Sequence, residues 1–304
     1  MRYITFDGAA NSMTIRCLLL VLLASTASGQ SRELGAPQIV DVPSGNLHLK
    51  AYFWKPAGPG PFPAVLFNHG SGGQDAAHTA GMPITEAAER LAPLFLKHGY
   101  AFLYLFRRGQ GLSTDQAPFM QDLLQREEAA KGKDARQHLQ FVLLTTEQLS
   151  DAMAGLSFLK HAPGIDAGRI AIAGHSFGGQ LTLLAAEHDK RIRATFTFAA
   201  AAGSWNRSPE LRKRLLTAMR STSAPIMLIH ASNDYDTSAG HALADELERL
   251  HKTHQLRIYP AVGKTSEDGH NFLYEAMPVW ENDVFRFLDA QVKAGGGIET
   301  RCVR

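Results

Sequence analysis

The sequence predicts an α/β fold, in which a mostly parallel, twisted sheet of about eight strands has helices on both faces. Three observations lead to this prediction. From Ala64 onward, short apolar runs alternate with segments whose apolar residues recur at helical spacing. Most of the short runs are apolar throughout, which is typical of strands covered by helices on both sides. A long charged segment after Phe106 interrupts the alternation and predicts an insertion.

The expected elements follow one another along the chain. Residues 47–56 alternate weakly between polar and apolar, as an antiparallel strand does. The later strands are expected at 64–70, 100–106, 169–174, 193–201, 224–230 and 255–260. The helices are expected at 85–99, 147–161, 178–188, 208–220, 238–252 and 277–292. The insertion, at about 114–146, is charged and helical in character. We expect it to cover the carboxyl ends of the strands, where ligands bind in open α/β sheets, with a plain surface elaboration as the alternative.

The N-terminal residues 1–29 are expected to be a secretory signal peptide. Arg16 precedes the apolar run 17–24, and the small residues Ala27 and Gly29 fit the positions before a cleavage point. The run is too short to span a bilayer. We therefore expect export to the periplasm or the medium and no stable membrane insertion of the mature protein. A buried N-terminal helix is the alternative.

Two details refine this expectation. Met13 starts a better-proportioned signal than the first methionine, so residues 1–12 are a candidate upstream extension. The mature part, residues 30–304, is expected to form a single domain. Cys17 lies within the signal, which leaves Cys302 without a partner and predicts no internal disulfide.

The charge balance excludes some classes of partner. The formal net charge is +2, and no basic run has interleaved aromatic residues. Neither feature favours binding to nucleic acid or to an anionic membrane surface. A small-molecule partner is expected instead, and the oligomeric state is left open.

A candidate nucleophile lies in the stretch RIAIAGHSFGGQ, residues 169–180. Gly174, Ser176 and Gly178 match the pattern G-x-S-x-G where a strand is expected to give way to a helix. Small residues on both sides of a serine allow the sharp turn that exposes its hydroxyl, and the following helix N-terminus favours negative charge. An ordinary Gly/Ser turn is the alternative reading.

A serine nucleophile needs a histidine base and a carboxylate that orients it, and after such a turn they follow in the order acid, then histidine. Asp234 and Asp236 both follow the strand expected at 224–230. His270 follows the strand expected at 255–260 and is placed in a loop, from which it can reach Ser176.

The chain resembles the α/β-hydrolases, and most of all their dienelactone hydrolase and prolyl-oligopeptidase-like branch. The resemblance rests on motifs that cover nearly the whole mature chain in family order: NHGSGG (68–73), RRGQGLS (107–113), GHSFGG (174–179), ASNDYDTS (231–238) and DGHNF (268–272). It implies the α/β-hydrolase fold. It also selects Asp234 over Asp236 and thereby implies the triad Ser176–Asp234–His270.

One departure from the family pattern bears on the substrate. Dienelactone hydrolases use a cysteine nucleophile, whereas this chain has Ser176. The difference puts dienelactone itself in doubt as the substrate and favours ordinary ester or acyl chemistry.

The oxyanion formed by such an attack needs preorganised N–H donors. One is expected to be the backbone N–H of Phe177, directly after the nucleophile. Similar enzymes imply that the other is Ser71, with Gly72 as second choice. Trp205 follows the strand expected at 193–201 and is a candidate wall of the acyl pocket, alongside Gly72 in substrate binding; a surface-packed aromatic is the alternative.

Arg107 and Arg108 follow a buried strand. They could bind an anionic substrate, but we prefer the interpretation that one of them pairs with Glu147 or Asp151 and anchors the insertion. His69 and His175 flank the two key loops without a second ligand at metal-binding spacing. No metal and no cofactor are expected.

Taken together, these observations predict a carboxylesterase-like serine hydrolase that cleaves small-molecule esters through an acyl-enzyme. The nearest alternative is an exported serine peptidase or amidase that resembles the prolyl-oligopeptidase group. A non-catalytic binding protein with the same fold is a further alternative.

Overall fold

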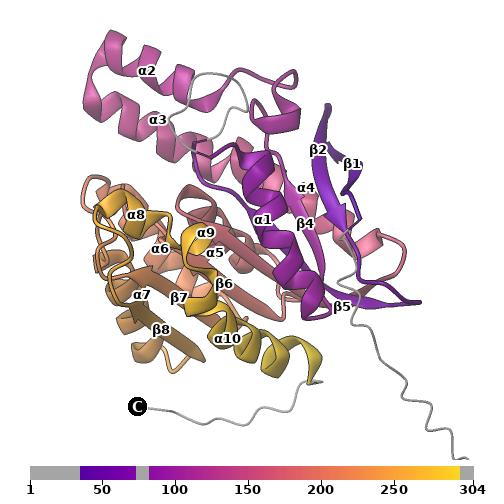
Figure 1. Ribbon diagram of the computed structural model, residues 1–304. Coiled ribbons are helices and arrows are strands. Elements are labelled where there is room, and N and C mark those ends of the chain that lie inside the picture. The colour runs from indigo at the N-terminus through magenta and orange to yellow at the C-terminus, as the bar shows by residue number, and fades with distance from the viewer. Residues whose placement is uncertain (1–34, 73–81, 295–304) are drawn as a thin grey trace, which may run out of the picture. The chain divides into compact units, whose positions relative to one another are not determined.

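One sheet of eight strands runs through residues 35–72 and 82–294, the part of the chain that the computed structural model describes (Figure 1). The strands are β1 (Gln38–Ser44), β2 (Leu47–Trp54), β3 (Phe62–Asn68), β4 (Ala101–Leu105), β5 (Ile165–His175), β6 (Ala194–Phe198), β7 (Ile226–Ala231) and β8 (His254–Tyr259). Their order in space is β1-β2-β4-β3-β5-β6-β7-β8. Only the pairings of β2 with β1 and with β4 are antiparallel, so the predicted mostly parallel sheet is confirmed.

The helices are α1 (Ile84–Lys97), α2 (Met120–Lys131), α3 (Lys133–Thr145), α4 (Glu147–His161), α5 (Phe177–His188), α6 (Pro209–Ser221), α7 (Ser238–Arg249), α8 (Ser266–His270), α9 (Phe272–Glu275) and α10 (Met277–Leu288). All of these helices and strands belong to the unit Ala36–Arg304, into which the chain divides after Gly35. The expected signal peptide, residues 1–29, lies outside the described residues. No helix among those described is long and apolar enough to cross a bilayer.

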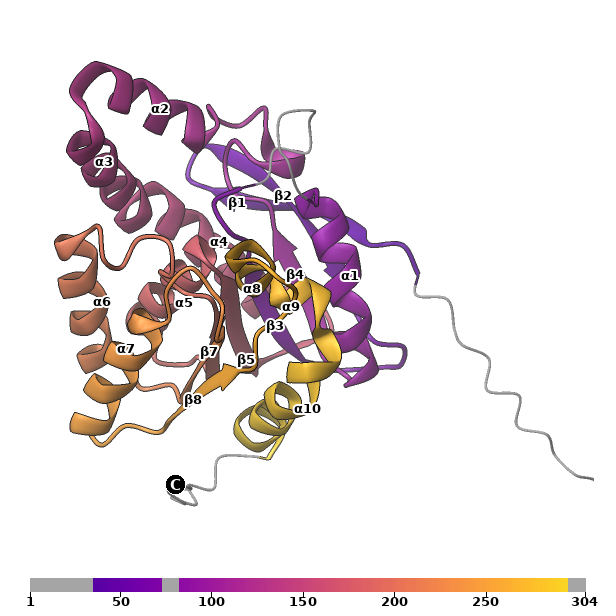
Figure 2. The same ribbon diagram turned by 60° about the vertical axis from the view of Figure 1, so that its left-hand side comes forward.

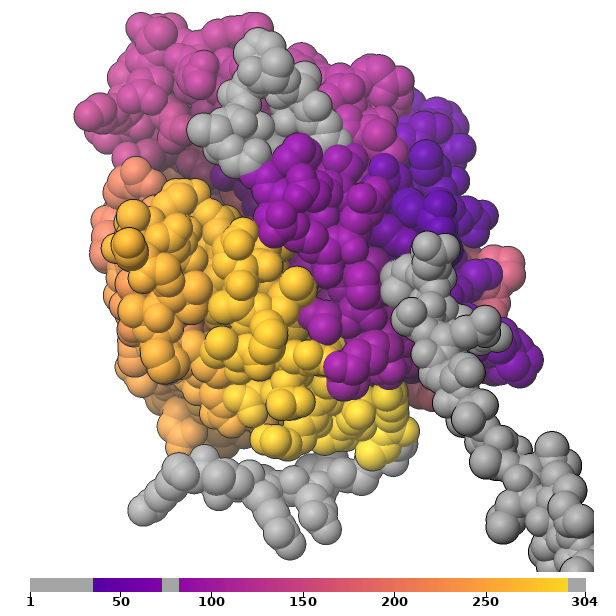
Figure 3. Space-filling view, in the orientation of Figure 1, coloured from indigo at the N-terminus to yellow at the C-terminus, as the bar shows by residue number. Residues whose placement is uncertain are grey.

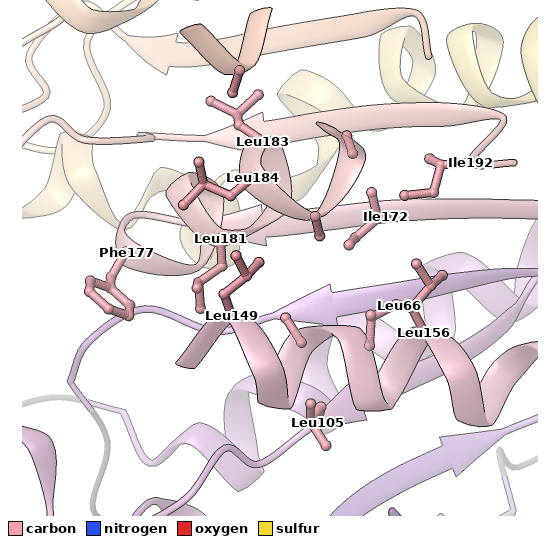
Figure 4. Close-up of a cluster of buried hydrophobic side chains, with 14 of the residues drawn as sticks. Leu66, Leu105, Leu149, Leu156, Ile172, Phe177, Leu181, Leu183, Leu184 and Ile192 are labelled. Carbon is pink, nitrogen blue, oxygen red and sulfur yellow. The ribbon is translucent and has the colours of Figure 1, made fainter. Parts of the chain in front are cut away.

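The central strands β3, β4, β6 and β7 bury both of their faces, as their uninterrupted apolar runs predict. In β3, Leu66 belongs to a cluster with α4 and α5, whereas its neighbours Val65 and Phe67 belong to a second cluster with α1 and α10. Successive side chains of a strand point to opposite faces, so one apolar strand serves both layers. Figure 4 shows the first cluster, in which Leu66 lies close to Leu156 of α4.

The second cluster packs α1 against the C-terminal helix α10. Phe95 of α1 stacks on Phe102 of β4 at 4.4 Å and meets Phe285 of α10 edge-on at 5.3 Å between ring centroids. The space-filling view shows the purple surface of α1 directly against the yellow surface of the C-terminal helices (Figure 3). Aromatic pairs of this kind contribute about 1 kcal/mol each beyond the area that they bury.

The segment expected to be a helical insertion forms α2 and α3. The two helices are joined at Gly132, whose φ of 89° is accessible to glycine at little cost. Both views place the pair above one end of the sheet (Figures 1 and 2). Nδ1 of His138 in α3 lies 3.2 Å from Oε2 of Glu210 in α6, so the insertion also contacts the body of the domain.

Candidate active site

Ser176 lies on a sharp turn between β5 and α5. Its φ of 54° and ψ of −116° are sparsely populated by residues other than glycine, and holding them costs about 1–3 kcal/mol. The flanking glycines make the turn possible. A Cβ on Gly174 would lie 2.3 Å from the Gly178 carbonyl oxygen, and a Cβ on Gly178 would lie 2.0 Å from that of Asn68. The motif is therefore a strained turn that presents the serine hydroxyl.

The structure brings Ser176, His270 and Asp234 together from three separate segments. Nε2 of His270 lies 2.9 Å from Oγ of Ser176. Nδ1 of the same ring lies 2.7 Å from Oδ1 of Asp234. His270 and Asp234 are both buried. The geometry allows the hydroxyl to donate to the imidazole while the imidazole donates to the carboxylate.

His270 was expected in a loop, but it is the last residue of the short helix α8. A capping box starts this helix: the Thr265 hydroxyl accepts the backbone N–H of Asp268, and the Asp268 side chain accepts the N–H of Thr265. Gly269 allows the close packing of α8, because a Cβ there would lie 2.5 Å from the Asn233 carbonyl oxygen. A capped turn therefore positions the imidazole.

The Asp234 carboxylate binds a second histidine, His230 of β7. Nδ1 of His230 lies 2.7 Å from Oδ2 of Asp234, and the side chain of His230 is only 1% exposed. Burial alone would raise the pKa of Asp234, but the hydrogen bonds from His230 and His270 outweigh burial and lower it. Sequence reasoning missed His230. The available signal was a single polar residue in the otherwise apolar run of β7.

Asp236, the alternative acid, has other partners. Its carboxylate accepts hydrogen bonds from the backbone N–H and the hydroxyl of Ser238, both at 2.8 Å, at the start of α7. It also contacts the side-chain amide of Asn206. An acidic side chain is favourable at this end of a helix, so Asp236 stabilises the turn while Asp234 faces His270.

His175 and Tyr235 both contact His270, one at its backbone and the other at its ring. Nε2 of His175 donates to the backbone carbonyl of His270 at 2.9 Å, and Tyr235 stacks on its imidazole with ring centroids 4.3 Å apart. Burial, with a smaller effect of the neighbouring His270, lowers the pKa of His175 to about 3. His175 is therefore a neutral donor at physiological pH.

The expected oxyanion donors lie on either side of Ser176. Phe177 is the first residue of α5, where a backbone N–H has no acceptor within the helix. Ser71 follows β3 in a loop that runs beside the nucleophile, since a Cβ built on Gly70 would lie 3.6 Å from Cβ of Ser176. The placement suits the two predicted roles, which remain predictions.

The two arginines after β4 have different partners. Arg108 forms the ion pair expected with Asp151 at 2.7 Å and approaches Glu147 at 3.8 Å. These three residues flank the insertion at 114–146, so the pair forms beside it. Arg107 turns inward and donates to backbone carbonyls of the loop after β3.

A cavity of about 1240 Å³ opens beside the nucleophile. Its wall includes Ser71, Gly72, Ser176, His270 and, from the insertion, Gln121, Arg136 and Gln140. A second cavity of about 520 Å³ lies between α3 and α6. The two share Arg136, Gln140, Gln180, Ser204 and Arg207 as lining residues, so they adjoin. The insertion therefore forms part of the wall of the site.

Trp205 is not among the described residues that line either cavity. Its indole is only 4% exposed and belongs to the cluster with α5 and α6, so it is neither a pocket wall nor a surface aromatic. The chain turns back directly after β6, where the backbone N–H of Trp205 donates to the carbonyl of Ala201, and this turn directs the side chain inward.

Within the described ranges, no group of three His, Cys, Asp or Glu residues could hold a metal ion.

The sheet order, the strained serine turn and the histidine beside it define an α/β-hydrolase. The family model named Dienelactone hydrolase family matches residues 49–281. The chain belongs to this family, which supports a hydrolase activity.

Solved structures with the same fold include enzymes of different kinds. The acylaminoacyl peptidase of Pyrococcus horikoshii matches with a TM-score of 0.60 and 20% identity, over 87% of this chain and 44% of that protein. Est1E of Butyrivibrio proteoclasticus, solved with ferulic acid, matches with a TM-score of 0.59 and 17% identity, over 84% of this chain and 99% of Est1E. A dienelactone hydrolase of Anabaena variabilis matches with a TM-score of 0.54 and 21% identity, over 84% of this chain and 97% of that protein. At these identities the likeness concerns the fold.

A sequence relative is the quorum-quenching protein AidA of Acinetobacter baumannii, 28% identical over 162 residues. The match covers 53% of this chain and 43% of AidA. This chain thus matches less than half the length of that relative.

Proposed function

We propose that this protein is a serine hydrolase that cleaves carboxylic ester bonds of small molecules through an acyl-enzyme. One observation carries the proposal: the continuous hydrogen-bonded path from Ser176 to His270, at 2.9 Å, and from His270 to Asp234, at 2.7 Å. A hydroxyl, an imidazole and a carboxylate in this arrangement activate the serine as a nucleophile.

In the first step, Oγ of Ser176 attacks the ester carbonyl carbon while Nε2 of His270 accepts the hydroxyl proton. The N–H groups of Phe177 and Ser71 stabilise the negative charge that develops on the carbonyl oxygen. As the tetrahedral intermediate collapses, the bond to the alcohol oxygen breaks. His270 gives its proton to the departing alcohol, and the acyl group stays on Ser176.

In the second step, a water molecule attacks the acyl carbon while His270 takes a proton from it. Collapse of the second intermediate releases the carboxylic acid, and the proton returns to Oγ of Ser176. Asp234 keeps the imidazole oriented and stabilises its protonated form in both steps. Since its hydrogen bonds lower the pKa of Asp234, this carboxylate is ionised throughout the neutral range.

The size and composition of the site support a small-molecule substrate. The cavity of about 1240 Å³ beside Ser176 has both polar and apolar lining residues and adjoins a second cavity under the insertion. An ester whose acyl chain extends from Ser176 toward Gln180, one helical turn further along α5, would enter this second space. An aminoacyl amide is the alternative substrate, since a solved structure with the same fold is named an acylaminoacyl peptidase.

The test uses the purified protein and p-nitrophenyl butyrate. We expect ester turnover, labelling by a fluorophosphonate probe, and a probe adduct at Ser176 by peptide mass spectrometry. Ser176→Ala should lose at least 1000-fold in kcat and keep its cooperative unfolding.

Ser157→Ala, on the exposed face of α4, is the matched control and should retain both turnover and labelling. Ester turnover by Ser176→Ala at the parental rate would refute the mechanism. A parent that takes up no probe would favour the non-catalytic alternative. Faster cleavage of aminoacyl p-nitroanilides than of esters would favour the peptidase.

Export belongs to the proposal as well. The basic residue, apolar run and small residues of 1–29 support a cleaved signal. Expression of the full chain in a Gram-negative host should yield a periplasmic protein whose N-terminus is Gln30, as determined by mass spectrometry. An uncleaved protein that stays in the cytoplasm would contradict it.

A further inference from the structure

Arg107 is a buried cation that the proposed reaction does not use. Its side chain, directly after β4, is 0% exposed. Among the described residues, no carboxylate forms an ion pair with it, and the nearby Asp151 pairs with Arg108 instead. Burying a cation without a carboxylate partner is costly, and such a residue is rarely kept for stability. Its hydrogen bonds indicate what it does.

The guanidinium binds two successive carbonyl groups of the loop after β3. Nη1 donates to the carbonyl of His69 at 2.9 Å, and Nη2 donates to that of Gly70 at 2.8 Å. Nε donates to Oε1 of Gln148 at 2.8 Å, and this third hydrogen bond fixes the plane of the guanidinium group. Only a planar group with several donors can hold all three acceptors at once.

These contacts determine which way the following N–H points. The Gly70 carbonyl and the Ser71 N–H belong to one peptide group, and in a trans peptide they point in opposite directions. Arg107 occupies the carbonyl side, so the N–H of Ser71 points away from Arg107. The loop lies beside Ser176, where the substrate oxygen would develop its charge.

His69 adds a second restraint on the same carbonyl. Its Nδ1 lies 2.8 Å from the Gly70 oxygen, and its Nε2 accepts the backbone N–H of Arg107 at 3.4 Å. Both contacts fit a neutral ring with the proton on Nδ1. Burial, together with the charge of Arg107, lowers the pKa of His69 well below its usual value. The ring therefore remains a neutral donor.

We propose that Arg107 is a positioning residue that holds the Gly70–Ser71 peptide group with its N–H directed at the oxyanion. The inference rests on the proposed function, since it concerns the same site. A cation at the carbonyl end of a peptide group polarises that group, which strengthens the N–H as a donor. The guanidinium also lies 5.6 Å from the ring centroid of Phe177, so it contacts the side chain of one expected donor and, through the Gly70 carbonyl, the peptide group of the other.

The experiment compares Arg107→Met and Arg107→Lys with the parent, using p-nitrophenyl butyrate and an alkyl trifluoromethyl ketone. The ketone forms a tetrahedral adduct with the serine, so its inhibition constant reports oxyanion binding. Arg107→Met should lower kcat about 100-fold or more, as does loss of one oxyanion donor. KM should stay within about threefold, and the inhibition constant should rise by the same factor as kcat falls. Arg107→Lys should have a kcat and an inhibition constant between those of the parent and of Arg107→Met, because one ammonium group cannot reach three acceptors.

Arg108→Met is the matched control. It removes the neighbouring ion pair with Asp151 and should lower stability to urea, but it should leave kcat and the inhibition constant within about threefold of the parent. A merely structural role of Arg107 predicts that both variants behave alike.

Two results would overturn the inference. One is a folded Arg107→Met with parental kcat; the other is a lower kcat with an unchanged inhibition constant. If Arg107→Met does not fold, Gln148→Met removes only the acceptor of Nε. It should lower kcat and raise the inhibition constant about threefold to tenfold together, and parental values would again overturn the inference.

A crystal structure separates this inference from the proposed function. If the Gly70 carbonyl of Arg107→Lys keeps its direction without any contact from the lysine, Arg107 is not what holds it, whether or not the protein cleaves esters. Full activity of Ser176→Ala would refute the proposed function and leave that crystallographic result unaffected.

Discussion

His230 and His270 bind opposite oxygens of one carboxylate, each with Nδ1 2.7 Å from the Asp234 oxygen that it faces. His230 therefore anchors Asp234 independently of His270. A carboxylate held on one oxygen can rotate, whereas one held on both presents its second oxygen in a fixed direction.

This arrangement predicts different effects for two substitutions of His230. His230→Phe removes the donor, so Asp234 loses its anchor and its charge acts undivided on His270. We expect kcat/KM to fall about tenfold, which corresponds to about 1.4 kcal/mol. His230→Asn, whose amide can donate from a similar position, should keep the parental kcat/KM. A parental kcat/KM in His230→Phe would contradict the role.

The strained turn at Ser176 predicts that Gly178 cannot be enlarged. In Gly178→Ala, the added Cβ would lie 2.0 Å from the Asn68 carbonyl oxygen. The backbone beside the nucleophile must shift, so we expect a loss of about 3 kcal/mol in the free energy of unfolding and a large drop in kcat. Urea titration and ester turnover measure the two effects. Gly168→Ala, where the Cβ meets only the movable Asp166 side chain, should change stability by less than about 0.5 kcal/mol.

The buried His175 predicts a loss of stability in mild acid. Its pKa is about 3 in the folded protein against 6.5 for the free group, so only the unfolded chain takes up its proton between these values. The stabilisation is complete above pH 6.5 and is lost as the pH falls toward 3. At pH 5 the free energy of unfolding is about 2 kcal/mol lower than above pH 6.5 on account of this group. The free energy of unfolding, measured with urea, should fall less between pH 7.5 and pH 5 in His175→Asn than in the parent, and the difference should be about 2 kcal/mol. The exposed His241→Asn should retain the parental dependence, and an unchanged slope in His175→Asn would refute this explanation.

The adjoining cavities predict that Ser204 controls access for long acyl chains. Ser204 lines both cavities and accepts a hydrogen bond from Nε2 of Gln180 at 3.0 Å. Ser204→Trp would fill the shared wall, so we expect KM for p-nitrophenyl octanoate to rise at least fivefold, about 1 kcal/mol. The acetate ester should be unaffected. Ser157→Trp, on the exposed surface of α4, is the control and should leave both KM values unchanged. If Ser204→Trp changes KM equally for the octanoate and the acetate ester, long chains do not enter the second cavity.

Local pattern was enough to predict most of the fold. The helix predicted at 147–161 has the same bounds as α4, because its apolar spacing and its flanking residues agree. β1 was not expected, since a short edge strand containing Pro43 has only Val40 and Val42 as apolar inward-facing residues. Its pairing with β2 depends on the hairpin and not on its own composition.

The side chains that meet at the site were only partly predictable. The serine turn has a local signature, and the chain order of acid and base narrows the other two positions to a few candidates. The anchor His230 and the loop-binding Arg107 have no such signature. His230 lies only four residues before Asp234, but no local pattern marks the pair, and the acceptors of Arg107 come from other loops and helices. The prediction for Trp205 was wrong because the chain reverses directly after β6, which a continuous apolar run does not reveal.

Gln121 of α2 lines the cavity beside Ser176 and also donates from Nε2 to the Ser71 carbonyl at 3.3 Å. The insertion, which lines the cavity, thus also touches the loop that would stabilise the transition state. An engineer who exchanges this pair of helices for another would change recognition and turnover together. Transplants that carry residues 107–110 and 68–72 along with the new helices should keep more of their rate than transplants of the helices alone.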